Sequence, residues 1–251
     1  MASWSRQRKS LYALIVIVVL AVAIGVPGFF LFYKAPTCFD GIQNGNEQGI
    51  DCGGSCQKLC PSAFLAPIQS WTRFEQVSPG FYNVAAYVIN PNPNAIAVRV
   101  PYHMALYDDQ GVTIRDVYGT MTLPPHRNTL AFQGSVSTEE RVPAKAFFEF
   151  TASPDWSLAA DTLSSLQVTG KDYNEDAAGS SLQVSLHNGS ASHIGHLSVY
   201  AVLYDSSQNE VGFSKTEIDG IAPGATAVAP YTWPEDRHNA VVSIEVLPVA
   251  E

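Results

Sequence analysis

The chain contains two copies of one strand-rich pattern, and this duplication restricts its fold more than any other feature. The tripeptide Leu-Tyr-Asp at residues 106–108 recurs at residues 203–205, and the turn residues around it recur at nearly the same offset. A nearly constant offset over this length predicts two tandem domains. We place repeat 1 at residues 62–158 and repeat 2 at residues 159–251.

Apolar side chains alternate with polar ones inside each copy, which is typical of a strand with one buried face. Turn-forming residues separate these runs, and helix-period segments are scarce beyond the N-terminus. Without crossover helices, parallel sheets are not expected. The sequence therefore predicts an all-β chain with two tandem immunoglobulin-like β-sandwiches. The core positions predicted from the alternation are Val98, Val100, Tyr102, Met104 and Leu106 in repeat 1, and Leu197, Val199, Ala201 and Leu203 in repeat 2.

The Leu-Tyr-Asp tripeptide has a physical reason at the end of a strand. Leu106 and Leu203 are predicted to point into the core, and the tyrosines to lie against the neighbouring edge. Asp108 and Asp205 are predicted to accept hydrogen bonds from amides of the turn that follows, as Asx residues do. Because they occur once per copy, we do not expect them to form a pair of catalytic acids.

Three motifs of repeat 1 are similar to those of a family of small β-sandwiches that includes the late-embryogenesis LEA14-like domains and the FxLYD domains. They are VINPNP at residues 88–93, YHMALYD at residues 102–108 and LPPHRN at residues 123–128. Repeat 2 carries the counterparts LHNGS, VYAVLYD and IAPGAT, with Asn188-Gly189-Ser190 in place of the Asn-Pro-Asn turn. The resemblance implies non-enzymatic, extracytoplasmic or stress-associated modules that share no catalytic residues.

Residues 11–33 form an apolar segment without a single charged side chain. At about 1.5 Å of rise per residue, a helix of this length crosses the roughly 30 Å hydrocarbon layer of a membrane. Arg6, Arg8 and Lys9 precede the segment. The positive-inside rule therefore places residues 1–10 in the cytoplasm and the rest of the chain on the outer side. We expect a single transmembrane helix.

A cleaved signal peptide is the alternative for this segment, with Ala21-Val22-Ala23 as a small-residue cleavage site. Ten more apolar or small residues follow that site. A secretory apolar region usually has about 7–15 residues, which is shorter than the run in this chain. The length of the segment therefore favours an uncleaved anchor.

All four cysteines lie in residues 34–61, directly after the apolar segment. On the outer side of a membrane, an even number of closely spaced cysteines indicates disulfides, and four cysteines can pair in three ways. Zinc is the alternative, but the spacing departs from the paired pattern that structural zinc sites use. We therefore expect a small disulfide-rich module that begins next to the membrane. Its bridging residues are Cys38, Cys52, Cys56 and Cys60.

Four residues with hard oxygen atoms lie among glycines between these cysteines: Asp40, Asn44, Glu47 and Asp51. Such oxygen atoms are the ligands that calcium prefers, although the spacing is not that of an EF-hand. The same side chains can instead cap turns by accepting hydrogen bonds from nearby amides. Both interpretations stay open, so no cofactor is required and calcium is a candidate.

The pattern C-x-D-G-x-x-N-G-x-E-x-x-x-D-C-G-G-x-C over residues 38–56 resembles a motif of many secreted and surface proteins, commonly bacterial. Three residues separate Cys56 from Cys60, where the motif usually has one or two. The resemblance implies a juxtamembrane module and no catalysis.

Charge and motif content exclude several classes of function. The chain has a net charge of −9 and no basic stripe, which argues against nucleic-acid binding. It contains no nucleophile elbow, phosphate-binding loop or zinc-protease motif, so we do not expect an enzyme. We interpret three nearby histidines as surface or loop residues and four large aromatic residues as core rather than as a carbohydrate-stacking surface. These are His187, His193 and His196, and Trp71, Trp156, Trp233 and Tyr231.

We therefore expect a single-pass cell-membrane protein with a cytoplasmic N-terminus, and with its disulfide-rich segment and sandwiches on the outer side. Its expected function is that of a non-enzymatic binding or scaffolding module of the cell envelope. A calcium- or glycan-binding surface receptor is the alternative. The expected partners are the membrane, crossed once, and another envelope protein or a glycan.

Overall fold

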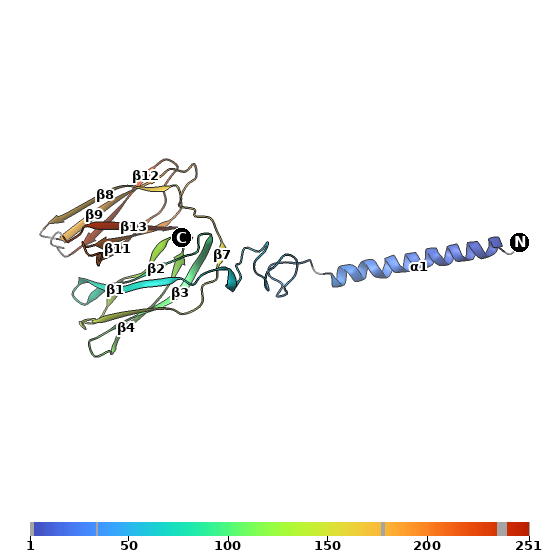
Figure 1. Cartoon of the computed structure of the whole chain (residues 1–251), viewed down its shortest axis with the longest axis horizontal. Coiled ribbons are helices and arrows are strands. Elements are labelled where there is room, and N and C mark those ends of the chain that lie inside the picture. Colours follow the sequence, from blue (N-terminus) through green and yellow to red (C-terminus); the bar gives the residue numbers. More distant parts are fainter. Residues whose placement is uncertain (1–2, 34, 177–178, 235–239, 251) are drawn as a thin grey trace. The chain divides into compact units, whose positions relative to one another are not determined.

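A computed structural model describes residues 3–33, 35–176, 179–234 and 240–250 of the chain (Figure 1). The chain divides into two compact units, Met1–Cys56 and Gln57–Glu251. The first unit contains a long helix and most of the cysteine-rich segment, and the second contains the strands.

The helix α1 covers Ser3–Phe32 and contains one proline, Pro27. Its apolar span is Arg8–Leu31, in which an 18-residue window has a mean hydropathy of 2.9 and is not buried against other parts of the protein. A helix with these properties close to an N-terminus has the length and composition of a membrane anchor or a signal sequence. Its position agrees with the apolar segment of the sequence.

The described residues beyond the helix form a one-turn 3-10 helix at Pro61–Ala63 and thirteen strands. The strands attributed to repeat 1 are β1 (Ile68–Ser78), β2 (Phe81–Ile89), β3 (Ala95–Tyr107), β4 (Thr113–Leu123), β5 (Asn128–Ser137), β6 (Lys145–Phe150) and β7 (Ser157–Leu158). Those attributed to repeat 2 are β8 (Leu166–Asp176), β9 (Gly179–Asn188), β10 (Leu197–Tyr204), β11 (Glu210–Ile218), β12 (Thr226–Trp233) and β13 (Ser243–Ala250).

The two sets of strands build the same pair of sheets. Strands β1, β2 and β5 form one sheet of repeat 1, and β4, β3 and β6 form the other, with the short β7 also paired to β3. In repeat 2 the sheets are β8-β9-β12 and β11-β10-β13, in the same order. All paired strands are antiparallel. Each pair of sheets encloses its own apolar core. The predicted all-β fold of two tandem β-sandwiches is therefore confirmed.

One predicted core position is wrong. Val98 is 55% exposed, whereas Ala97 and Val100 are buried. The pairing of β3 with β4 shifts register between Ala97 and Val100, and Arg99 lies in this β-bulge with a φ of 52°. A bulge inserts one extra residue, so the alternation changes phase and side chains before it point the other way. The other eight predicted core residues are buried.

The Leu-Tyr-Asp tripeptide behaves as its chemistry predicts. Leu106 and Leu203 are almost fully buried. Asp108 Oδ1 accepts hydrogen bonds from the backbone amides two and four residues further on, at 3.1 and 2.8 Å. Asp205 Oδ1 accepts the equivalent pair at 2.8 and 2.9 Å. These amide hydrogen bonds hold the pKa of both carboxyls below the usual value, because they stabilise the charged form.

Two buried asparagines, Asn90 and Asn188, occupy equivalent places at the end of β2 and β9. Each side-chain amide donates hydrogen bonds to backbone carbonyls of neighbouring turns, and each side-chain oxygen accepts an amide two residues further on. Asn188 has no exposed surface, although Asn188-Gly189-Ser190 reads as a glycosylation sequon. In the folded protein this sequon is therefore closed to modification.

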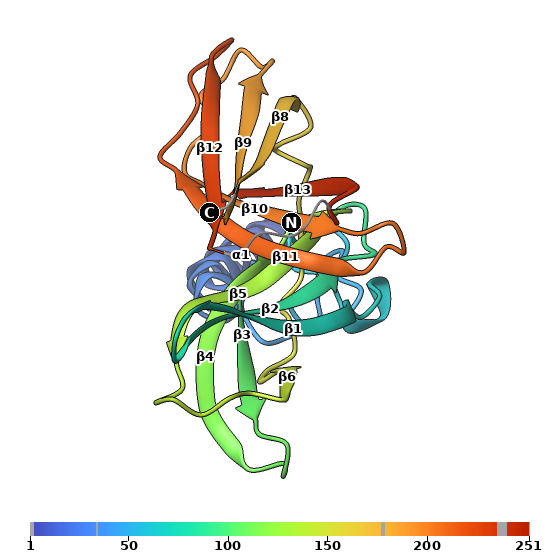
Figure 2. The same ribbon diagram turned by 90° about the vertical axis from the view of Figure 1, so that its left-hand side faces the viewer.

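A third apolar cluster joins the two sandwiches. It lies between the sheet β1-β2-β5 of repeat 1 and the sheet β11-β10-β13 of repeat 2, which face each other in Figure 2. As a result β10 is buried on both of its faces. The buried members of this inter-repeat core are Ala85, Tyr87 and Leu130 from repeat 1, and Tyr200, Val202, Phe213, Leu247 and Val249 from repeat 2.

Polar contacts surround the inter-repeat core. Both oxygens of the Glu245 carboxylate accept tyrosine hydroxyls, from Tyr87 of repeat 1 at 2.9 Å and from Tyr204 at 3.0 Å. Arg73 of repeat 1 pairs with Glu210 of repeat 2. Burial, with the Glu245 charge as a further cause, raises the pKa of both tyrosines. Both hydroxyls therefore stay protonated as donors at neutral pH.

The contact between the repeats is head-to-tail, because different sheets of the two copies meet. A contact of this kind can in principle continue into a longer stack. The free face of β4-β3-β6, however, carries polar residues where repeat 2 has Tyr200, Phe213 and Leu247. They are His103, Asp116 and Glu149, and the His103 ring contacts both carboxylates, at 2.7 and 3.2 Å. The hydrogen bond to Asp116 raises the pKa of His103. A polar outer face of this kind ends a stack of repeats.

Candidate functional site

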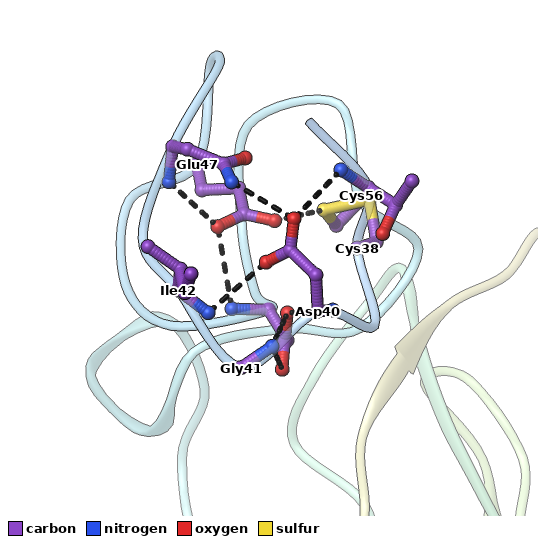
Figure 3. The surroundings of a disulfide bond; sticks show 9 residues. Cys38, Asp40, Gly41, Ile42, Glu47 and Cys56 are labelled. Carbon is purple, nitrogen blue, oxygen red and sulfur yellow. Dashed lines mark hydrogen bonds between the residues drawn. A yellow bond between two sulfur atoms is a disulfide. The ribbon is translucent and has the colours of Figure 1, made fainter. Parts of the chain in front are cut away.

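The cysteine-rich loop is held by oxidised cysteines. Cys38 and Cys56 form a disulfide with a Cα–Cα distance of 5.6 Å (Figure 3). Cys52 and Cys60 are also disulfide-bonded, and no cysteine is free in the described part of the chain. Zinc needs thiolates, which oxidised cysteines do not supply. The expected disulfides are therefore present. Of the pairings that the sequence left open, the structure contains that of Cys38 with Cys56.

Backbone geometry in this loop depends on glycine. Gly54 has a φ of 62°, and a Cβ atom there would lie 1.6 Å from the carbonyl oxygen of Asn46. No side chain fits at that distance, so the close approach of two chain segments requires glycine at position 54.

The four oxygen-bearing residues lie in one loop, and the carboxylates of Asp40, Glu47 and Asp51 accept hydrogen bonds from amides of that loop. Asp51 accepts the backbone amides of Asp40 and Gly41 at 3.0–3.1 Å. Asp40 accepts the amide of Ile42 at 3.0 Å, as Figure 3 shows. Glu47 accepts the amides of Asn44 and Asp51 at 3.2 and 3.3 Å. The arrangement is that of turn caps that tie the loop to itself.

We expect calcium to leave the stability of the full-length protein unchanged. A calcium ion would have to compete with the amide hydrogen bonds that Asp40, Glu47 and Asp51 already make. The test compares thermal unfolding in millimolar calcium and in chelator, with magnesium as the ionic-strength control. A melting temperature that rises with calcium and not with magnesium would instead assign these residues to a calcium site.

The other residues that the sequence singled out do not converge on a site. Trp156, Trp233 and Tyr231 are only 1–3% exposed and belong to the cores, and Trp71 packs against the inter-repeat core. These four residues therefore form no carbohydrate-stacking surface. His187, His193 and His196 do not form a metal-binding group within the described ranges.

A cleft that sequence reasoning missed lies where the repeats meet. Its volume is about 600 Å³, and residues of β3, β4 and β5 face residues of β10, β11 and β13 across it. Two cations, Arg99 and Lys215, line it together with tyrosine, phenylalanine and glutamine side chains. Volumes of about 300–1,000 Å³ at domain interfaces are typical of small-molecule sites.

The described lining of the cleft contains none of the carboxylate, imidazole and thiol groups that often serve in acid–base or nucleophilic catalysis. Among the described residues, no histidine, cysteine, aspartate or glutamate lines it. A general base would be needed to activate either of its two threonines, Thr120 and Thr122. No signal in the sequence marks this place, because Arg99 alternates with Val98 and Val100 as a polar residue of a half-buried strand does. The facing repeat cannot be located from this pattern.

No protein-family model matches the sequence, and no curated protein matches it. Among solved structures, a β-glucuronidase from glycoside hydrolase family 2 is similar over 87% of this chain and 29% of its own, with 8% identity and a TM-score of 0.26. A Bacteroides uniformis β-glucuronidase 2 is similar over 69% of this chain and 26% of its own, with 11% identity and a TM-score of 0.23. A red sea bream transglutaminase is similar over 72% and 29%, with 12% identity and a TM-score of 0.23.

The chain spans less than a third of the length of each of these three structures. With TM-scores this low, the likenesses assign no family, activity or ligand to it.

Proposed function

We propose that the protein is a membrane-anchored, extracytoplasmic and non-enzymatic module of the cell envelope that binds or scaffolds a partner near the membrane. One observation carries the proposal: an unburied apolar helix of membrane-spanning length is followed directly by a loop of oxidised cysteines. Disulfides persist in oxidising compartments, so the loop belongs on the far side of the membrane from the cytosol.

The strand-bearing unit supports a binding role over a catalytic one. Its two sandwiches share an apolar core and polar cross-contacts, which makes them one stiff body rather than two hinged domains. The cleft at their junction has no histidine, cysteine or carboxylate among the described residues that line it. The Asp-capped turns of both copies are consistent with LEA14-like or FxLYD-type sandwiches, and we propose that relationship for both repeats.

The test is the orientation of the full-length chain in intact cells. We expect a C-terminal tag to be removed by protease added outside and an N-terminal tag to be protected. All four cysteines should resist alkylation by maleimide–polyethylene glycol until a reductant is added, because they are oxidised.

Two controls make this result decisive. A cytosolic protein of the same cells must stay intact during proteolysis, and both tags must occur on one chain before protease is added, because cleavage of a signal peptide would separate them. Four thiols that react without reductant, or a protected C-terminal tag, would contradict the proposal.

A further inference from the structure

We propose that the inter-repeat cleft binds a small organic carboxylate, with Arg99 and Lys215 at the carboxylate and the aromatic residues of the cleft at its ring or alkyl body. This inference rests on the proposed non-enzymatic binding function and names the class of ligand. It concerns the cleft of about 600 Å³ between β3, β4 and β5 of repeat 1 and β10, β11 and β13 of repeat 2.

The charge of the cleft opposes that of the protein. The chain has 23 acidic against 14 basic residues, yet the described residues that line the cleft include two cations and no carboxylate. Arg99 has no hydrogen-bond or ion-pair partner among the described residues. Lys215 contacts Glu217 at 2.8 Å and lies 6.0 Å from the centre of the Tyr200 ring. A cleft lined by charges of one sign attracts ligands of the opposite charge. A guanidinium suits a carboxylate because it can donate two parallel hydrogen bonds to it.

Arg99 has a backbone conformation that residues with a Cβ atom rarely adopt. Its φ of 52° lies in the left-handed region, which is unfavourable for a residue with a Cβ atom. Strained residues of this kind occur more often at binding sites than elsewhere, and β-bulges often re-aim a side chain. The same bulge turns Val98 outward, so that it lines the cleft as well.

Gly119 leaves space for two polar side chains that line the cleft, those of Tyr102 and Gln133. Gly119 lies opposite Tyr102 in the β3–β4 pair, and a Cβ there would lie 2.5 Å from the Tyr102 hydroxyl. The absence of a side chain at this position lets the hydroxyl reach Gln133, which donates to it at 2.9 Å. The Tyr102 hydroxyl also donates to the carbonyl oxygen of Phe132 at 3.3 Å, so this hydrogen-bonded pair holds Gln133 at the lining of the cleft.

Aromatic rings from both repeats supply the apolar part of the lining. Phe132 of repeat 1 and Tyr200 of repeat 2 both line the cleft, with ring centres 6.3 Å apart. Met121 and Val249 add aliphatic surface. A ligand that contacts both the two cations and the apolar lining carries one negative group and a compact apolar body. An aryl or branched alkyl carboxylate fits this description better than an inorganic anion does.

The experiment measures binding of phenylacetate to the purified full-length protein in detergent, by calorimetry and by ligand-observed NMR. Neutral phenylacetamide is the matched ligand control. The variant is Arg99→Asn, because asparagine accepts a positive φ more readily than most residues and removes the charge. Lys145→Gln, which removes an exposed cation on β6, is the matched control variant.

We expect saturable binding of phenylacetate to the unaltered protein, and about tenfold or more weaker binding of phenylacetate to Arg99→Asn. Phenylacetamide should bind the unaltered protein about tenfold or more weakly than phenylacetate does. In both cases a charge-assisted hydrogen bond is lost. Lys145→Gln should bind as the unaltered protein does. A second variant, Lys215→Met, should also weaken binding. The thermal unfolding of each variant shows that the fold is retained.

The cleft proposal is overturned if phenylacetate shows no saturable binding at millimolar concentration, if the amide binds equally well, or if Arg99→Asn has no effect. Its failure is distinguishable from failure of the proposed function. Conversion of the ligand, visible in the same NMR spectra, would contradict the non-enzymatic proposal, whereas absent binding of an unchanged ligand overturns the cleft alone.

Discussion

Replacing Phe213 with alanine is expected to lower the free energy of unfolding by about 3–5 kcal/mol, the range for phenylalanine truncations in a packed core. Phe213 is 2% exposed, and its ring lies 6.0 Å from that of Trp71 and 6.3 Å from that of Phe132. Both of these rings belong to repeat 1, so the cavity opens at the contact between the repeats. The loss should therefore also uncouple the two sandwiches.

Denaturant unfolding of the full-length protein in detergent, followed by tryptophan fluorescence, measures both effects. Trp71 reports the contact between the repeats, and Trp233 reports the core of repeat 2. We expect the variant to unfold at lower denaturant and in two steps. The matched control is Tyr118→Ala, which truncates an aromatic residue that is 69% exposed and should change stability by less than about 1 kcal/mol. Equal stability of the two variants would show that the inter-repeat core contributes little.

Replacing Asn188 with alanine is expected to lower the free energy of unfolding by about 3–5 kcal/mol, because several buried polar groups lose their partners at once. Asn188 Nδ2 donates to the carbonyl oxygens of Ser192 at 2.8 Å and Ile221 at 3.0 Å. Its Oδ1 accepts the amide of Ser190 at 3.0 Å and its hydroxyl at 2.7 Å. Alanine removes every one of these bonds and leaves the hydrogen-bond partners of Asn188 without it.

The same unfolding measurement tests this prediction, with Asn209→Ala as the control. Asn209 Nδ2 also donates to one oxygen, that of Asp205 at 3.2 Å, but the pair is exposed to solvent, which can replace the bond. We expect a change of about 1 kcal/mol or less for this control. If Asn188→Ala were as stable as Asn209→Ala, the hydrogen bonds of Asn188 would not hold the neighbouring turns together. Its sequon would then become a candidate for modification.

The two buried asparagines, Asn90 and Asn188, show how much of a structure a sequence pattern can predict. The sequence identified the Asn-containing turns of both copies as equivalent, because the repeat offset aligns Asn90 with Asn188. It indicated turn formers and nothing about burial. Their hydrogen bonds go to carbonyls more than 30 residues away, such as those of Pro124 and Ile221. Only the folded backbone brings these carbonyls together.

The candidate cleft was beyond sequence reasoning for a related reason. Arg99 looked like an ordinary polar residue of a half-buried strand, and Lys215 like one of a surface strand. Neither position suggests a site, because the residues are more than a hundred positions apart. They share a cleft only because the sheet β1-β2-β5 packs on β11-β10-β13.

The sequence by itself determined the elements that depend on local chemistry. These are the apolar helix, the period-two strands and the Asp-capped turns, each decided by neighbouring residues, and the oxidised loop, whose Cys38–Cys56 bridge spans 18 positions. Tertiary structure alone decided the phase change at Val98 and the burial of both faces of β10. Whether a face of a strand is buried depends on what lies against it, and for β10 that is a sheet of the other repeat.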